Sequence, residues 1–331
     1  MPTGAMGRRL HVCFDAVSTS LFPMALGLAG TGAAWRAAAA PLDVPRFGDV
    51  GEVLGVVAAG MLVAVAAAYG GKALAAPDEV AMDLASVNTA NLLAPALMTG
   101  AVVGAQFADH SAGKAVWAVS ACLHGLLLLA FVGRWLTASI EPEELTPTWF
   151  LPTAGFMTSA LTWPQVGSDL LPWMIVGVGA TTWLMLLPLV FRRLLFEPPL
   201  APALRPTLMI MAAPFGLAAG SALELDGQHS DWVALPLVSA GSFLVLVFAT
   251  DWRFLTSAGV TLTWWAATFP QAVLAAVWFR LAGRLSPDLR WLGILFLVSA
   301  TLAVLMATAT TGAVLSRAFR GPPSPSHQRE H

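Results

Sequence analysis

The chain has 331 residues, of which 57% are hydrophobic and only 11% carry a formal charge. Soluble domains average about 25% charged residues, so this composition excludes an ordinary soluble globular fold. The net charge of −2 provides no basic surface, and we expect no nucleic-acid partner.

Apolar stretches follow one another along nearly the whole sequence. A transmembrane helix needs about 20 predominantly apolar residues. Segments near this length lie at residues 16–35, 52–70, 85–106, 115–136, 149–165, 171–192, 206–223, 232–250, 257–279 and 290–314. The connections between them are short, so consecutive spans must run antiparallel. The sequence therefore predicts an all-α integral membrane protein whose ten transmembrane helices form one domain, residues 16–315.

The two ends of the chain are polar and short. Residues 1–15 are expected to be a short N-terminal segment, and the Pro-rich residues 316–331 are expected to be a disordered tail. Lys and Arg are more numerous in the loops on the side that carries both ends. The positive-inside rule then places both termini in the cytoplasm, with the lipid bilayer as the main partner of the chain.

Proline recurs inside the odd-numbered spans, whereas the even-numbered spans have none or have it near an end. The five positions are Pro23, Pro95, Pro152, Pro214 and Pro270. A proline within a helix removes a backbone hydrogen bond and kinks the helix. The alternation predicts five helical hairpins, each with a kinked inner helix and a straighter outer helix, arranged around a central pore.

None of the ten spans has a formal charge in its interior, because residues such as Glu224 and Arg280 are expected at ends or in loops. A pathway between the spans would then be electrically neutral, which favours a passive channel or facilitator over a pump. His124, in the fourth span, is the one titratable group expected at depth. It is either a hydrogen-bonded packing residue or a proton relay.

The spans contain no recognisable catalytic motif, and the isolated histidines and cysteines form no metal-ligand pattern. We therefore expect no enzymatic activity, no cofactor and no metal site. The ninth span is more informative, because Phe269 directly precedes Pro270. A kink there would turn the Phe269 ring toward the inner face, where it either packs in the core or closes a narrow pore as a hydrophobic gate.

Five stretches together resemble a known family. They are LFPMALGLAGTGAAWR, VLGVVAAGMLVAVAAAYGGKAL, TPTWFLPTAGFMTSAL, LRPTLMIMAAPFGLAAGSAL and WWAATFPQAVLAA. Over residues 18–315 the chain is similar to the tellurite-resistance/dicarboxylate transporter (TDT) family, which includes the bacterial TehA-type proteins and the plant slow-type (SLAC-like) anion channels.

The resemblance implies a ten-helix bundle with quasi-fivefold symmetry and the odd-numbered helices inside. It also implies a homotrimer with one pore per subunit, located in a bacterial inner (plasma) membrane. In the family an aromatic ring on the ninth helix closes the pore, and Phe269 occupies that position, with Pro23 of the first span as its expected neighbour.

The implied substrates are small inorganic or carboxylate anions. The candidate anion contacts are the hydroxyls of Thr19, Thr153 and Thr268, the N-terminal ends of helices, and Arg205, which could equally anchor the seventh helix at the membrane surface. A second hypothesis is a proton-coupled transporter or exporter of C4-dicarboxylate, sulfite or tellurium oxyanions that uses His124. A third, of another class, is a non-transporting membrane scaffold or sensor.

Overall fold

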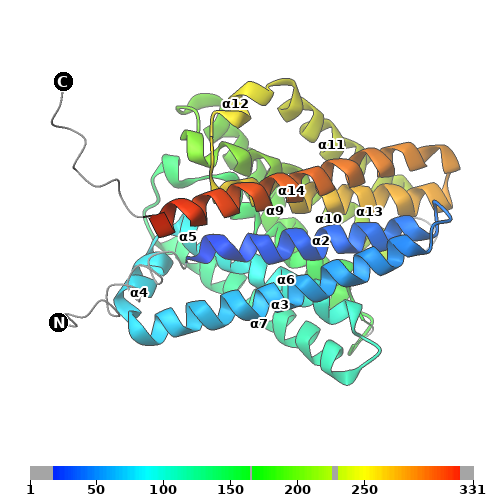
Figure 1. The fold of residues 1–331 in the computed structure, drawn as a ribbon, viewed down its shortest axis with the longest axis horizontal. Helices are drawn as coiled ribbons and strands as arrows, with labels where there is room; N and C mark the ends of the chain where they lie inside the picture. Colours follow the sequence, from blue (N-terminus) through cyan, green and yellow to red (C-terminus); the bar gives the residue numbers. More distant parts are fainter. Residues whose placement is uncertain (1–17, 165, 226–229, 321–331) are drawn as a thin grey trace.

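The computed structural model describes residues 18–164, 166–225 and 230–320, and within these ranges the chain is built of helices and turns without a β-strand (Figure 1). The expected N-terminal segment, residues 1–15, lies outside them. Within the described ranges, seven helices are long and apolar enough to cross a membrane by length and composition. They are Arg46–Ala75, Val87–Gln106, Ser111–Thr137, Leu171–Phe196, Pro202–Leu225, Asp231–Thr250 and Pro287–Arg317. The chain is thus a helical, multi-pass membrane protein.

Five long helices form the outside of the molecule. They are α3 (Arg46–Ala75), α7 (Ser111–Thr137), α9 (Leu171–Phe196), α11 (Asp231–Thr250) and α14 (Arg290–Arg320). Between 22% and 39% of their most apolar stretches is buried, and the exposed side chains are mainly Val, Leu and Phe. In water such surfaces would be unfavourable, whereas acyl chains solvate them well. Since α14 continues to Arg320, the first five residues of the expected tail are helical.

The remaining long segments lie inside and combine 3₁₀ with α geometry. They are η1 (Thr19–Leu21) with α2 (Phe22–Ala39); α5 (Val87–Ala90), η2 (Asn91–Leu93) and α6 (Ala94–Gln106); η4 (Pro147–Phe150), η5 (Ala154–Phe156) and α8 (Met157–Leu161); η6 (Pro202–Ala212) with α10 (Ala213–Leu225); and η7 (Leu262–Ala267) with α13 (Thr268–Arg284). In the two inner segments with a measured apolar window, 67% and 72% of that window is buried. We call these five the inner segments.

Each inner segment packs against the outer helix that follows it in sequence: α2 against α3, α6 against α7, α8 against α9, α10 against α11, and α13 against α14. The inner helices also contact one another in the closed order α2, α6, α8, α10, α13 and back to α2. Figure 1 shows α2, α3, α13 and α14 running along the long axis, with the start of α2 and the end of α14 at the same end of the molecule. The inner helices therefore surround a common axis.

The prolines occupy positions that differ from the expected mid-helix kinks. Pro23, Pro95, Pro214 and Pro270 lie in the first turn of α2, α6, α10 and α13, directly after a 3₁₀ segment. In the first turn of an α-helix the missing N–H of proline removes no intrahelical bond. These prolines therefore mark the change from 3₁₀ to α geometry. Pro152 lies in the turn between η4 and η5.

Four short elements complete the described part of the chain, and one of them, η3 (Pro142–Glu144), follows α7. Helix α4 (Pro77–Ala85) connects α3 to α5 and has no buried residue. Its last carbonyls, those of Leu84 and Ala85, accept hydrogen bonds from the Arg134 guanidinium of α7. Helix α12 (Trp252–Thr256) follows α11, and η8 (Pro287–Leu289) precedes α14.

Candidate functional site: a pathway through the inner segments

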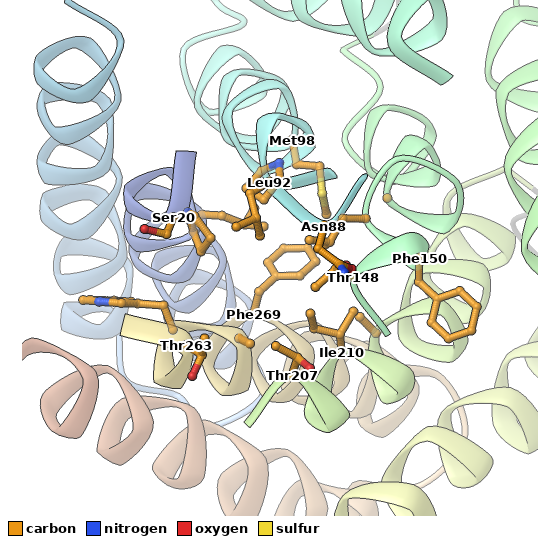
Figure 2. Close-up of a pocket in the computed structure, with 18 of the residues that line it drawn as sticks. Ser20, Asn88, Leu92, Met98, Thr148, Phe150, Thr207, Ile210, Thr263 and Phe269 are labelled. Carbon is orange, nitrogen blue, oxygen red and sulfur yellow. The ribbon is translucent and has the colours of Figure 1, made fainter. Parts of the chain in front are cut away.

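A cavity of about 440 Å³, which we call the vestibule, lies among the inner segments near the end where they begin. All five segments contribute to its wall, and the close-up in Figure 2 shows the side chains. The polar members of the wall come from the starts of the segments and include Ser20, Asn88, Thr148, Thr207 and Thr263. Farther along, the wall becomes apolar.

The 3₁₀ geometry of η6 explains one side of the vestibule. Leu204, Thr207, Ile210 and Ala213 all line it, at a constant spacing of three residues. Side chains at i and i+3 eclipse in a 3₁₀-helix, which has three residues per turn. In an α-helix the same four residues would drift around the axis. The long 3₁₀ run thus presents a straight row of side chains to the cavity.

The electrostatics at the vestibule favour negative solutes. The N-terminal ends of the inner segments meet there, and the N-terminus of a helix carries about half a positive elementary charge. Asp83 is the one formally charged side chain among the described residues of the wall. Its Oδ2 lies 3.2 Å from Nζ of Lys72, which is also 3.5 Å from Oε2 of Glu79. Lys72 is thus shared between two carboxylates and compensates the charge of Asp83 only in part.

Phe269 lies at the inner boundary of the vestibule. Its side chain is 6% exposed, and it lines both the vestibule and a second cavity of about 90 Å³, which we call the narrow chamber. Figure 2 shows the ring projecting into the vestibule from α13. A Cβ atom added at Gly30 of α2 would lie 2.6 Å from Cδ2 of Phe269. The ring thus bridges α13 and α2, two turns beyond the expected neighbour Pro23, which lines the vestibule instead.

The narrow chamber leads toward the opposite end of the molecule. Ala37 and Arg280 line both this chamber and a third cavity of about 500 Å³, which we call the outer bowl. Glu224 and Arg284 belong to the wall of the outer bowl. The vestibule, the narrow chamber and the outer bowl therefore follow one another, with Phe269 between the first two.

The structure places the predicted threonines beside the pathway rather than in its wall. Thr19, Thr153 and Thr268 are fully buried, and each hydroxyl donates to a backbone carbonyl at 2.7–3.0 Å. None of them lines the vestibule or the narrow chamber. These hydroxyls donate to the backbone and lie outside the two cavity walls, so that contact between them and a passing anion stays a prediction.

Arg205 also lies outside these two cavities. Its Nε donates to the carbonyl of Leu200 at 3.1 Å, its Nη1 bonds Ser257, and its guanidinium stacks 4.1 Å from the centre of the Phe254 ring. These contacts fix the start of η6 against α12. They fit the anchoring role that the sequence left open for this residue.

His124 is fully buried between α7 and the turn that contains Pro152. Its Nε2 lies 3.2 Å from the carbonyl oxygen of Pro152, and its ring packs 5.4 Å from the ring of Phe156. None of the three cavities is lined by His124. The structure therefore favours the packing role over the proton relay.

Two residues of the pathway were missed by the sequence analysis. Thr158 of α8 lines the narrow chamber, and its buried hydroxyl has no hydrogen-bond partner among the described residues. Arg280 was assigned to the end of a span, but α13 continues to Arg284 and carries Arg280 in the chamber wall. The expectation of a wholly neutral pathway is wrong at this point.

The comparison with known families agrees with this arrangement. Residues 16–312 match the family model described as voltage-dependent anion channel (SLAC1). The chain belongs to this family. The resemblance found in the sequence is thereby confirmed over nearly the whole chain, and the voltage-dependent anion channel family comprises channels and transporters of anions in membranes. Among the curated proteins that were compared, none matches the chain. The described residues contain no group of three or more His, Cys, Asp or Glu side chains suited to a metal ion.

Proposed function

We propose that this member of the voltage-dependent anion channel family is a channel or facilitator that passes small anions through the vestibule and the narrow chamber, with Phe269 as the gate. The observation that carries the proposal is the position of Phe269, which alone belongs to the walls of both cavities among the described residues. A closed apolar ring at such a constriction blocks ions, because a dehydrated ion crosses it only at high cost.

The charge distribution supports anions over cations. The positive ends of the inner segments face the vestibule, and its one carboxylate, Asp83, is paired with Lys72. On the other side of Phe269, the charged side chain in the chamber wall is the cation of Arg280. Among the described side chains of the two cavity walls, Asp83 is the one carboxylate, and Lys72 weakens its attraction for a cation.

The family architecture supplies the rest of the proposal. The five inner-outer helix pairs are the five hairpins of a ten-helix, quasi-fivefold pore, and the segments η1–α2, η4–α8 and η7–α13 are the three spans beyond the seven long apolar ones. The protein assembles as a homotrimer in a bacterial inner membrane with both termini cytoplasmic, so that the vestibule opens to the cytoplasm.

The test is the variant Phe269→Ala. Reconstituted in proteoliposomes or expressed in oocytes, it should conduct chloride and nitrate about tenfold or more above the wild type, as removal of a barrier of about 1.4 kcal/mol requires. The matched control is Phe243→Ala, because that ring is 65% exposed on the outside of α11. An unchanged current in Phe269→Ala, at equal protein in the membrane, would refute the gate.

The other two hypotheses receive no support from a specific contact. Proton-coupled export required a titrating group on the pathway, whereas His124 lies outside all three cavities. A scaffold or sensor would show no anion flux in either Phe269 variant or wild type. The flux measurement therefore separates the scaffold from the two transport hypotheses, and the dependence of the flux on a pH gradient separates the channel from the proton-coupled exporter.

A further inference from the structure

We propose that the narrow chamber is a binding site for one small inorganic anion, held by the hydroxyl of Thr158 and the guanidinium of Arg280. The proposal rests on the proposed function, since it assigns a resting place to an anion that has passed Phe269. It adds a second point of selection on the far side of the gate.

The wall of the chamber is apolar apart from three side chains. The apolar members of the wall, among them Gly30, Val102 and Ala272, have side chains that form no hydrogen bond with a solute. Among the three polar members, Thr162 is already committed, because its hydroxyl donates to the carbonyl of Thr158 at 2.8 Å. The hydrogen-bonding capacity that remains belongs to Thr158 and Arg280.

The Thr158 hydroxyl points to a ligand by its lack of a partner. The side chain is fully buried, yet Oγ1 has no acceptor or donor among the described residues. The hydroxyl of Thr162, the residue directly after α8, does have a partner, the carbonyl oxygen of Thr158. Buried polar groups are nearly always paired, and Thr158 belongs to the wall of the chamber, so a ligand in the chamber is the partner that we assign to this hydroxyl. An O–H group is a suitable donor to an anion.

The inner helices point their C-terminal ends toward the chamber, so that an anion site there needs a positive side chain such as Arg280. The C-terminal ends of α2, α8 and α13 lie near the chamber, because Ala37, Leu161 and Arg280 line it. These ends carry about half a negative elementary charge each, so that an anion would be repelled here without a compensating cation. The guanidinium supplies that charge, and no carboxylate belongs to the described wall of the chamber.

Glu224 competes with the anion for the same guanidinium. Its Oε2 lies 3.2 Å from Nη1 of Arg280, and both side chains are more than a third exposed to the outer bowl. Exposed pairs of this kind are weak. A guanidinium has five N–H donors, so that one bond to Glu224 leaves others for a solute. The carboxylate therefore lowers the affinity of the site without closing it.

The volume of the chamber selects the class of anion. A cavity of about 10–15 Å³ by this measure holds one water molecule, so that 90 Å³ accommodates a small anion with part of its hydration shell. A C4-dicarboxylate is larger and carries two charges, whereas the chamber offers one cation. We infer that chloride or nitrate fits the site and that dicarboxylates do not.

The transport experiment uses the Phe269→Ala background, in which the gate is absent. The chloride concentration that gives half-maximal current should rise about tenfold or more in Arg280→Gln, since hydrogen bonds to charged groups are the strong ones. Thr158→Val should raise it severalfold, and Thr158→Ser, which keeps the hydroxyl, should restore it. Glu224→Gln should lower it. The control Arg284→Gln removes the other bowl arginine, whose Nε bonds Asp231, and should leave the value unchanged.

A binding measurement separates this proposal from the proposed function. Chloride binding to the purified protein with Phe269 in place is followed by the line width of ³⁵Cl resonances and by the chloride dependence of the melting temperature. Arg280→Lys serves as the conservative variant if Arg280→Gln folds poorly. Loss of chloride binding in Thr158→Val and Arg280→Gln supports the site. This holds even if Phe269→Ala carries no current, because the absence of current would refute only the gate. Equal chloride binding in wild type and both variants overturns the site, whatever the currents show.

Discussion

The contact between Phe269 and Gly30 allows the gate to be perturbed without changing the gate residue. In Gly30→Ala the new methyl carbon would lie 2.6 Å from Cδ2 and 3.2 Å from Cε2 of Phe269. Carbon atoms pack at about 3.5–4.0 Å, so the ring must retreat by about 1 Å. The 440 Å³ vestibule beside it provides the room.

The size of the effect follows from the side-chain torsion. A ring displacement of this size corresponds to a torsion roughly 30° from its rotamer, which costs about 0.5–1.5 kcal/mol. Because this cost falls on the closed state alone, the open-to-closed ratio should rise about 2- to 12-fold. The increase should be smaller than that of Phe269→Ala.

The assay is the initial rate of chloride efflux from proteoliposomes, normalised to the amount of inserted protein. Gly60→Ala is the matched control, because a Cβ atom at Gly60 of α3 meets nothing within 4 Å. In the Phe269→Ala background, Gly30→Ala should have no further effect. A rate in Gly30→Ala equal to that of Gly60→Ala, or an effect that persists without the ring, would refute the reasoning.

Two further predictions concern residues beside the pathway. His124→Ala should leave the pH dependence of anion flux unchanged, because the ring lines none of the three cavities. It should lower the melting temperature, since the buried carbonyl of Pro152 loses its partner at a cost of about 1–3 kcal/mol. An altered pH profile would support the proton relay instead. Gly293→Ala should destabilise the fold by about 1–3 kcal/mol, because its methyl would lie 2.7 Å from two ring atoms of the fully buried Phe279. Thermal unfolding measures this, with Gly312→Ala of the same helix, where a Cβ atom meets nothing, as control, and equal melting temperatures would contradict it.

Hydropathy located the segments of this protein well but not their faces. Each threonine predicted as an anion contact is adjacent in sequence to a residue that does line the vestibule: Ser20 follows Thr19, Ala154 follows Thr153, and Phe269 follows Thr268. Successive residues point about 100° apart on an α-helix, as at Thr268 and Phe269, and about 120° apart on a 3₁₀-helix, as at Thr19 and Ser20. A shift of one residue therefore moves a side chain from the face that lines the pathway to the face that packs against neighbouring helices.

The pathway residues that were missed depend on long-range packing. Thr158 is one of many threonines in the chain, and only the arrangement of the inner helices around the narrow chamber shows that this residue belongs to a cavity wall. Arg280 was assigned to a span end because an arginine at depth is costly. In the structure this cost is reduced, because the Arg280 side chain borders the outer bowl and pairs with Glu224. The place of Phe269 on the pathway, in contrast, can be predicted from the sequence, because the family resemblance and the neighbouring Pro270 both indicate it.

The straight row on η6 has a consequence for altering the length of this segment. With three residues per turn and a rise of about 2.0 Å, one inserted residue rotates everything upstream of it by about 120° relative to α10. Leu204 and Thr207 would then leave the vestibule together. An insertion of three residues keeps the register and displaces the row by about 6 Å along the axis. A designed change in the length of η6 therefore has to insert or remove residues in multiples of three if the same side chains are to face the vestibule.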